Sequence, residues 1–95
     1  MESKNLLDKL ERVERTINIY RISDDELISE INIDEIEFDL LTKIVPPPIE
    51  DPLLYDGYLL DEEQLVVFNS YMNNKIDLRI DLYYYILVCG GIYNW

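Results

Sequence analysis

The sequence of 95 residues contains no histidine and a single cysteine. Without histidine the commonest general base of enzymes is missing, and Cys89 has no imidazole partner to activate it as a nucleophile. The apolar setting of Cys89 predicts a buried, unreactive thiol. Glycine is also scarce: Gly57 stands alone and Gly90-Gly91 do not open a helix, so the sequence has no phosphate-binding loop. We therefore expect no enzymatic activity and no cofactor.

Long apolar runs are missing as well. No stretch approaches the ~20 apolar residues that a membrane-spanning helix needs. The first fifteen residues, MESKNLLDKLERVER, are charged throughout, unlike a signal peptide, and no Asn-x-Ser/Thr glycosylation site occurs. We expect a cytoplasmic protein in which residues 1–95 form one domain, because an apolar content of 48% is enough to build a core.

Basic residues are few: 8 Lys and Arg stand against 20 Asp and Glu, which gives a net charge of −12. Residues 22–74 hold fourteen of the acids and one base, Lys43. A surface of this sign repels nucleic acid phosphates and anionic lipids, and it attracts basic proteins, whose association it speeds roughly ten- to a thousand-fold at low salt. The alternative is that the acids serve solubility alone.

Two acidic triplets, Asp24-Asp25-Glu26 and Asp61-Glu62-Glu63, raise the question of calcium. Neither triplet has the glycine-containing loop pattern of a calcium-binding hand. A turn explains the first triplet and a helix cap the second. We therefore expect no metal site.

The first third of the chain predicts a helix and a β-hairpin. Apolar residues at helical spacing predict a short helix over Ser3–Val13. Alternating β-branched residues predict strands at Arg15–Ile22 and Leu27–Ile33. Between them, Ser23–Glu26 is typical of a turn, because its short side-chain oxygens can accept bonds from nearby backbone N–H groups.

Two further helices are indicated by the same start signal. Asp34 and Asp61 each precede a periodic apolar stretch and have Glu or Gln three residues later, the spacing of a capping box. The first of these helices should end at Pro46-Pro47-Pro48. The second should cover Glu62–Met72.

The longest predicted strand is Ile76–Cys89, IDLRIDLYYYILVC. Its even-numbered residues form a continuous apolar face, whereas the odd-numbered face begins charged and turns aromatic, as expected where a strand becomes covered on both sides. We expect a bend or bulge within Tyr83–Tyr85. A helix is the alternative, but the β-branched and aromatic residues favour a strand.

Together these elements predict an α+β fold. It has a small three-stranded antiparallel or mixed sheet with the C-terminal strand central, beside Arg15–Ile22, and two helices on one face. A short N-terminal helix completes it.

The segment Pro46–Leu60 carries all four prolines and is nevertheless rich in Leu and Tyr. A long ordered loop in a small domain is usually functional; the alternative is a lid over the core. Its tyrosines, with Tyr93 and Trp95 of the tail, are candidate anchors for a partner, because aromatic side chains combine large contact area with little entropy. The candidate partner-binding residues are Glu50, Asp51, Tyr55, Asp56, Tyr58, Asp61, Glu62 and Glu63.

Three stretches resemble small acidic bacterial immunity proteins of polymorphic-toxin and contact-dependent growth inhibition systems. They are YRISDDELISEI (Tyr20–Ile31), the loop around Leu54-Tyr55-Asp56 and the helix start Leu60-Asp61-Glu62-Glu63-Gln64. The likeness covers roughly Tyr20–Tyr85. It implies a cytoplasmic inhibitor that binds the C-terminal domain of a toxin, often a basic nuclease, and blocks its active site. The family supplies no catalytic residues.

From charge and resemblance together we expect an immunity protein for a basic toxin, an RNase. The alternative is a DNA mimic that inhibits a DNA-binding protein, which would need carboxylates spaced like phosphates on an elongated surface. A third interpretation is an acidic domain of unrelated function, with no basic partner.

Overall fold

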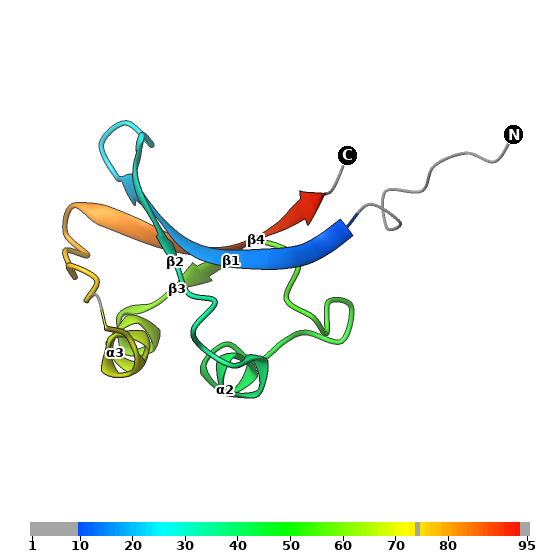
Figure 1. Ribbon diagram of the computed structural model, residues 1–95. Helices are drawn as coiled ribbons and strands as arrows, with labels where there is room; N and C mark the ends of the chain where they lie inside the picture. The colour runs from blue at the N-terminus through cyan, green and yellow to red at the C-terminus, as the bar shows by residue number, and fades with distance from the viewer. Residues whose placement is uncertain (1–9, 74, 94–95) are drawn as a thin grey trace, which may run out of the picture.

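In the computed structural model the chain forms a four-stranded antiparallel sheet with two helices on one face (Figure 1). The structure describes residues 10–73 and 75–93. In chain order its elements are β1 (Leu10–Arg21), β2 (Leu27–Asn32), α2 (Phe38–Ile44), β3 (Tyr58–Leu60), α3 (Glu62–Tyr71) and β4 (Tyr83–Tyr93). The strand order is β2-β1-β4-β3.

The predicted α+β class is confirmed, and so are the central C-terminal strand beside the first strand and the two helices on one face. The sheet, however, has four strands and not three.

The additional strand is β3, which lies within the segment that we expected to be loop. Its three residues pair antiparallel with β4, Tyr58 opposite Leu87 and Leu60 opposite Tyr85. So short a strand gives almost no alternation in the sequence, and its pairing with a distant segment decides its conformation. β3 fixes the end of the proline-rich loop against the sheet.

The long ladder between β1 and β4 forms the centre of the sheet. Ile17 and Ile19 of β1 lie opposite Leu87 and Tyr85 of β4, and all four side chains are buried beneath the helices. The covered face of β4 is therefore the odd-numbered one. The even-numbered residues point to the other face, which the two helices leave uncovered (Figure 1). Our expectation of cover on both sides was wrong.

Strand β4 starts later and ends later than predicted, at Tyr83 and Tyr93. The preceding segment, residues 76–82, is a loop without a neighbouring strand, because β1 ends at the pair Arg21 and Tyr83. This loop is held by the Asn69 side chain, which donates to the Ile76 carbonyl at 3.0 Å and accepts from the Ile76 N–H at 2.6 Å. The bulge expected within Tyr83–Tyr85 is absent, since the ladder with β1 runs through these residues without a register shift.

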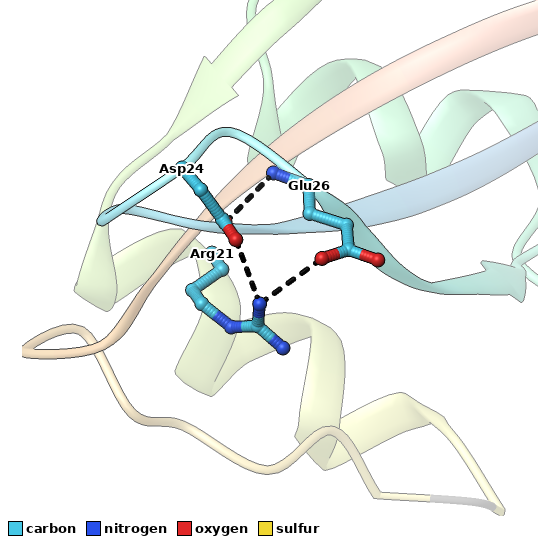
Figure 2. A network of polar contacts seen from close by, with 3 residues as sticks. All are labelled: Arg21, Asp24 and Glu26. Carbon is cyan, nitrogen blue, oxygen red and sulfur yellow. Dashed lines mark hydrogen bonds and ion pairs between the residues drawn. The ribbon is translucent and has the colours of Figure 1, made fainter.

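The predicted hairpin of β1 and β2 is confirmed, and so is the role of its turn. Asp24 Oδ1 accepts a bond from the Glu26 N–H at 3.1 Å, and Asp24 Oδ2 lies 2.9 Å from Arg21 Nη1 (Figure 2). The same nitrogen reaches Glu26 Oε2 at 3.1 Å. The bond from the Glu26 amide, followed by the contacts with Arg21, lowers the pKa of Asp24. Two of the acids in this turn are thus paired with a base of the same hairpin.

The predicted N-terminal helix over Ser3–Val13 is wrong where it can be compared. Residues 10–13 belong to β1, and residues 3–9 lie outside the described residues. The tail of β4 explains the difference, because Val13 pairs with Gly91 and Leu10 with Tyr93. A strand partner that distant in sequence overrides a local helical pattern.

The first helix after the hairpin, α2, begins later than predicted. Glu37 occupies the N-cap position without a side-chain bond, and the helix starts at Phe38. Asp34 accepts a bond from the Arg15 backbone N–H at 2.9 Å instead and so closes the end of the β1–β2 ladder. The predicted end is confirmed, because α2 stops at Ile44 before the three prolines.

The capping box of α3 is confirmed. Asp61 Oδ1 accepts from the Gln64 N–H at 2.8 Å, and the Asp61 N–H donates to Gln64 Oε1 at 2.9 Å. Gln64 also donates to the carbonyl of Ile44 at 3.1 Å and so ties the start of α3 to the end of α2. Leu65 and Phe68 point from α3 into the core. The largest side chains buried there are Tyr85, Phe68, Ile17, Ile33, Leu41, Leu54, Leu65 and Leu87.

The cap predicts the result of a substitution. Asp61→Ala should lower the free energy of unfolding by about 1 kcal/mol, because the Gln64 N–H loses its acceptor. In a domain of this size the melting temperature falls by roughly 4–8 °C. Glu62→Ala removes the same charge one residue later without touching the cap, so its effect should stay within about 0.5 kcal/mol. Equal melting temperatures for the two variants in thermal denaturation would contradict the capping box.

Candidate functional site

The segment between α2 and β3 is an ordered loop that lies against the sheet. Leu54 in its middle is completely buried and belongs to the core. Its backbone has a φ of 55°, a left-handed conformation that leucine rarely adopts, so the burial of its side chain stabilises a strained turn. The loop is thus fixed by its own apolar anchor.

Asp51 is the polar anchor of the loop. This side chain is buried, and its carboxylate accepts bonds from the N–H groups of Tyr55 and Asp56, both at 2.9 Å. The Tyr58 hydroxyl donates a third bond to it. The Tyr58 bond, followed by those from the Asp56 and Tyr55 amides, lowers the pKa of Asp51 below its usual value. Asp51 therefore holds the loop together and presents little surface to a partner.

Arg15 of β1 joins the loop to the body of the domain. Its Nη2 atom donates to the carbonyl of Leu53 at 2.7 Å, and its guanidinium lies 5.1 Å from the centre of the Phe38 ring. Its positive charge also helps to lower the pKa of Asp51. No pattern in the sequence indicates this role, because Arg15 and Leu53 are 38 residues apart.

The outward side of this loop combines apolar and acidic side chains. Ile49 is 97% exposed, and Leu53 and Tyr55 are about half exposed. Glu50 and Asp56 lie exposed beside them, and no base in the described part of the chain forms an ion pair with either. We refer to Ile49, Glu50, Leu53, Tyr55 and Asp56 as the loop surface.

Asp51 and the carboxylates of the loop surface act on Tyr58. The pKa of Tyr58 is raised to about 12, first by its bond to Asp51, then by burial and by the negative charges of Asp51, Asp56 and Glu50. The Asp51 carboxylate brings these residues together, because it bonds to the Tyr55 and Asp56 amides and to the Tyr58 hydroxyl, and Glu50 precedes it in the chain. Five of the predicted binding residues are therefore gathered in one place, although Asp51 and Tyr58 point inward.

The other three predicted residues begin α3. Asp61 is occupied as the helix cap, whereas Glu62 and Glu63 are exposed. They follow β3, so about 10 Å of extended chain separates Tyr58 from Asp61. Leu59, which lies between the two groups, is 71% exposed. The predicted set thus forms two acidic groups on either side of an exposed leucine.

Some exposed side chains of this region were not predicted from the sequence, and two of the aromatic residues proposed as anchors cannot be compared with the structure. The exposure of Ile49 and Leu53 was missed; the neighbouring prolines were the available signal, since they keep the chain extended away from the core. The side chain of Tyr93 is not described, and Trp95 lies outside the described residues. Cys89 is half-buried rather than buried, and burial raises the pKa of its thiol.

The described residues contain no group of three or more Cys, Asp or Glu side chains arranged to hold a metal ion. None of the helices in that part of the chain is long and apolar enough to cross a membrane. The loop surface presents carboxylates, an aromatic ring and aliphatic groups.

A family model described as a domain of unknown function, DUF7683, matches residues 14–88. This span reaches from within β1 to within β4 and includes the loop surface and both helices. No curated protein and no solved structure matches the chain.

The role of Asp51 predicts a dependence of stability on pH. Asp51→Asn should be less stable than wild type at pH 7, because an amide NH₂ cannot accept the bonds that the carboxylate accepts. The pKa of Asp51 is lowered by folding, so its charge stabilises the fold fully above the ordinary Asp pKa of about 4 and loses this effect as pH falls through the lower value. Urea denaturation should show a constant difference between the two proteins from about pH 7 to pH 5, which shrinks below about pH 4.

Glu50→Gln is the matched control, since it removes a neighbouring exposed charge that accepts no bond from the loop amides. It should leave the free energy of unfolding within about 0.5 kcal/mol of wild type. A difference between wild type and Asp51→Asn that does not change with pH would contradict the role of the charge.

Proposed function

The chain belongs to the DUF7683 family of domains of unknown function, and we propose that it is an immunity protein that binds and neutralises a basic toxin domain, an RNase, in the cytoplasm. It covers the active site of the toxin with the loop surface and the start of α3. The observation that supports this proposal most strongly is a fixed loop that exposes apolar side chains between carboxylates, which form no ion pair with any base among residues 10–73 and 75–93.

Fixing the loop before binding favours affinity. A flexible loop loses conformational entropy when it docks, whereas this loop has already lost it on folding. The buried Leu54 side chain anchors the loop in the core, and the Asp51 carboxylate bonds to amides within the loop. Arg15 joins the loop to the sheet. Most of its contact energy is thus available for the partner.

The carboxylates suit an RNase as the partner. The active site of such an enzyme holds Lys, Arg or protonated His side chains for the phosphates of RNA. Glu50 and Asp56, with Glu62 and Glu63, can occupy these cationic positions through charge-assisted bonds. The repulsion between the acids and RNA keeps the inhibitor itself off the substrate.

The apolar side chains favour a protein partner over DNA mimicry. A DNA mimic needs a surface of carboxylates at phosphate spacing, and Ile49, Leu53 and Tyr55 interrupt such an array. In a protein interface the same side chains are typical of the contact centre, with charges at its rim.

A stable interface is larger than the loop surface, so the contact must also include the acids at the start of α3. A typical complex buries ~1,600 Å² in total, with about 20–30 residues on each side. The five residues of the loop surface are too few, and the exposed Glu62 and Glu63 add to them from the start of α3, which directly follows β3. The contact therefore continues along β3 to the start of α3.

Charge reversal tests the proposal. The proposal predicts that the gene immediately upstream encodes a basic toxin domain, and that domain is the partner to use. The triple variant Asp56→Lys, Glu62→Lys and Glu63→Lys should weaken binding at least a hundredfold by calorimetry, because each substitution replaces an attraction to the cationic site by a repulsion. It should also fail to inhibit cleavage of RNA by that domain.

The matched control reverses three exposed acids elsewhere: Glu37, Asp39 and Asp77 to lysine. It changes the net charge by the same amount and should weaken binding less than tenfold. Wild-type affinity should fall as salt is raised, mainly through a slower association rate. Equal losses for the two triple variants would show that only the net charge matters, and unchanged affinity for both would exclude the electrostatic mechanism.

A further inference from the structure

The uncovered face of the sheet carries a groove that the proposed function does not use. It has a volume of about 250 Å³, and its walls come from three strands. β1 contributes Glu14, Thr16 and Asn18, β2 contributes Glu30, and β4 contributes Val88, Gly90 and Gly91. Thr16 lies directly opposite Val88 in one ladder, and Asn18 lies opposite Glu30 in the next. These side chains alternate with the buried Ile17 and Ile19 and therefore lie on the face away from α2 and α3 (Figure 1).

Gly90 forms part of the floor of this groove. Its backbone has a negative φ, so the conformation does not require glycine. The nearest atom to a Cβ placed there would be the Glu14 carbonyl oxygen at 4.0 Å, an ordinary contact. Glycine weakens the interior of a strand and often marks a place where another molecule approaches closely. Here the missing side chain leaves room above the sheet.

Polar groups in the groove are available for bonding. Asn18 is only 7% exposed although it lies on the uncovered face. Its Oδ1 accepts a bond from the Thr16 hydroxyl at 2.7 Å, but its Nδ2 donates to no group in the described part of the chain. Glu30 is exposed, and no described residue forms an ion pair with it. The Asn18 Nδ2 atom is therefore accessible to water in the groove, and a ligand that carries an acceptor can take the place of that water.

We propose that this groove binds an arginine side chain of a partner protein. The guanidinium pairs with the Glu30 carboxylate, the aliphatic stem lies over Val88 and Gly90, and an adjacent peptide carbonyl accepts from Asn18 Nδ2. Arginine suits the groove better than lysine, because its planar group donates up to five bonds to a carboxylate and to neighbouring oxygens. The net charge of −12 selects a basic partner and opposes a second copy of the chain.

This inference shares with the proposed function only the basic character of the partner. The groove is built on β2, β1 and β4, whereas the loop surface precedes β3 at the other edge of the sheet. A partner can therefore be contacted at either site independently.

The test uses nuclear magnetic resonance of the full chain labelled with ¹⁵N, at low salt. The probe is the capped peptide acetyl-Gly-Arg-Gly-amide; the comparison peptides carry Gln or Lys at the centre. The arginine peptide should cause saturable shifts of the backbone amides of Thr16, Glu30 and Gly90 and of the Asn18 side-chain NH₂. The Gln peptide should cause none, and the Lys peptide should bind at least threefold more weakly.

Two variants locate the site. Gly90→Val places a side chain in the groove, with its Cβ in ordinary contact with the Glu14 carbonyl oxygen. It should abolish these shifts while the melting temperature stays equal or rises, since valine favours strands. Glu30→Gln, on the exposed edge strand, should weaken binding of the arginine peptide at least fivefold. The control Glu37→Gln removes an exposed charge on the helix side and should leave this binding unchanged.

Three results would overturn the inference: shifts of equal size around Glu62 and Glu63, equal binding of the Lys peptide, or unchanged shifts in Gly90→Val. The outcome is separate from that of the loop surface. The variant with Asp56, Glu62 and Glu63 changed to lysine should still bind the arginine peptide, so loss of toxin binding in that variant bears on the loop surface alone.

Discussion

The pairing of β1 with β4 is the interaction on which the rest of this structure depends. It joins the two ends of the described chain over the whole length of both strands, from Leu10 opposite Tyr93 to Arg21 opposite Tyr83. Each of the two edge strands, β2 and β3, is attached to one member of this pair. The buried side chains of the ladder form the base on which both helices pack. Without it, neither the loop nor the uncovered face would have a support.

The two faces of this ladder have different roles. On one face, Arg15 and the core hold the loop that exposes Ile49 and Tyr55. On the other face neither α2 nor α3 lies over the sheet. Side chains there stay partly accessible, as in the stacked rings of Tyr20 and Tyr84, whose centres are 5.2 Å apart. Ordered loops on a rigid scaffold are the usual place for binding residues, which is consistent with the function proposed for the loop surface.

Local signals in the sequence predicted what local interactions decide. The capping box at Asp61, the stop of α2 at the prolines and the turn between β1 and β2 each depend on residues within a few positions, and each was correct. Distant partners decided the rest. Residues 10–13 had a helical pattern but pair with β4, and Asp34 had the spacing of a cap but bonds to Arg15. For the candidate site, composition alone indicated an acidic and aromatic loop. It could not show that Asp51 and Tyr58 point inward, because their bonds depend on the fold of the loop.

The central claim is that the loop surface is held in its binding conformation before any partner arrives. Amide hydrogen exchange of the free protein at neutral pH tests it most directly. The N–H groups of Tyr55 and Asp56, which donate to Asp51, should exchange at least a hundredfold more slowly than in an unfolded chain, and Asp51→Asn should remove this protection while β1 and β4 keep theirs. Exchange of these two amides at the rate of an unfolded chain in the wild-type protein would contradict the account.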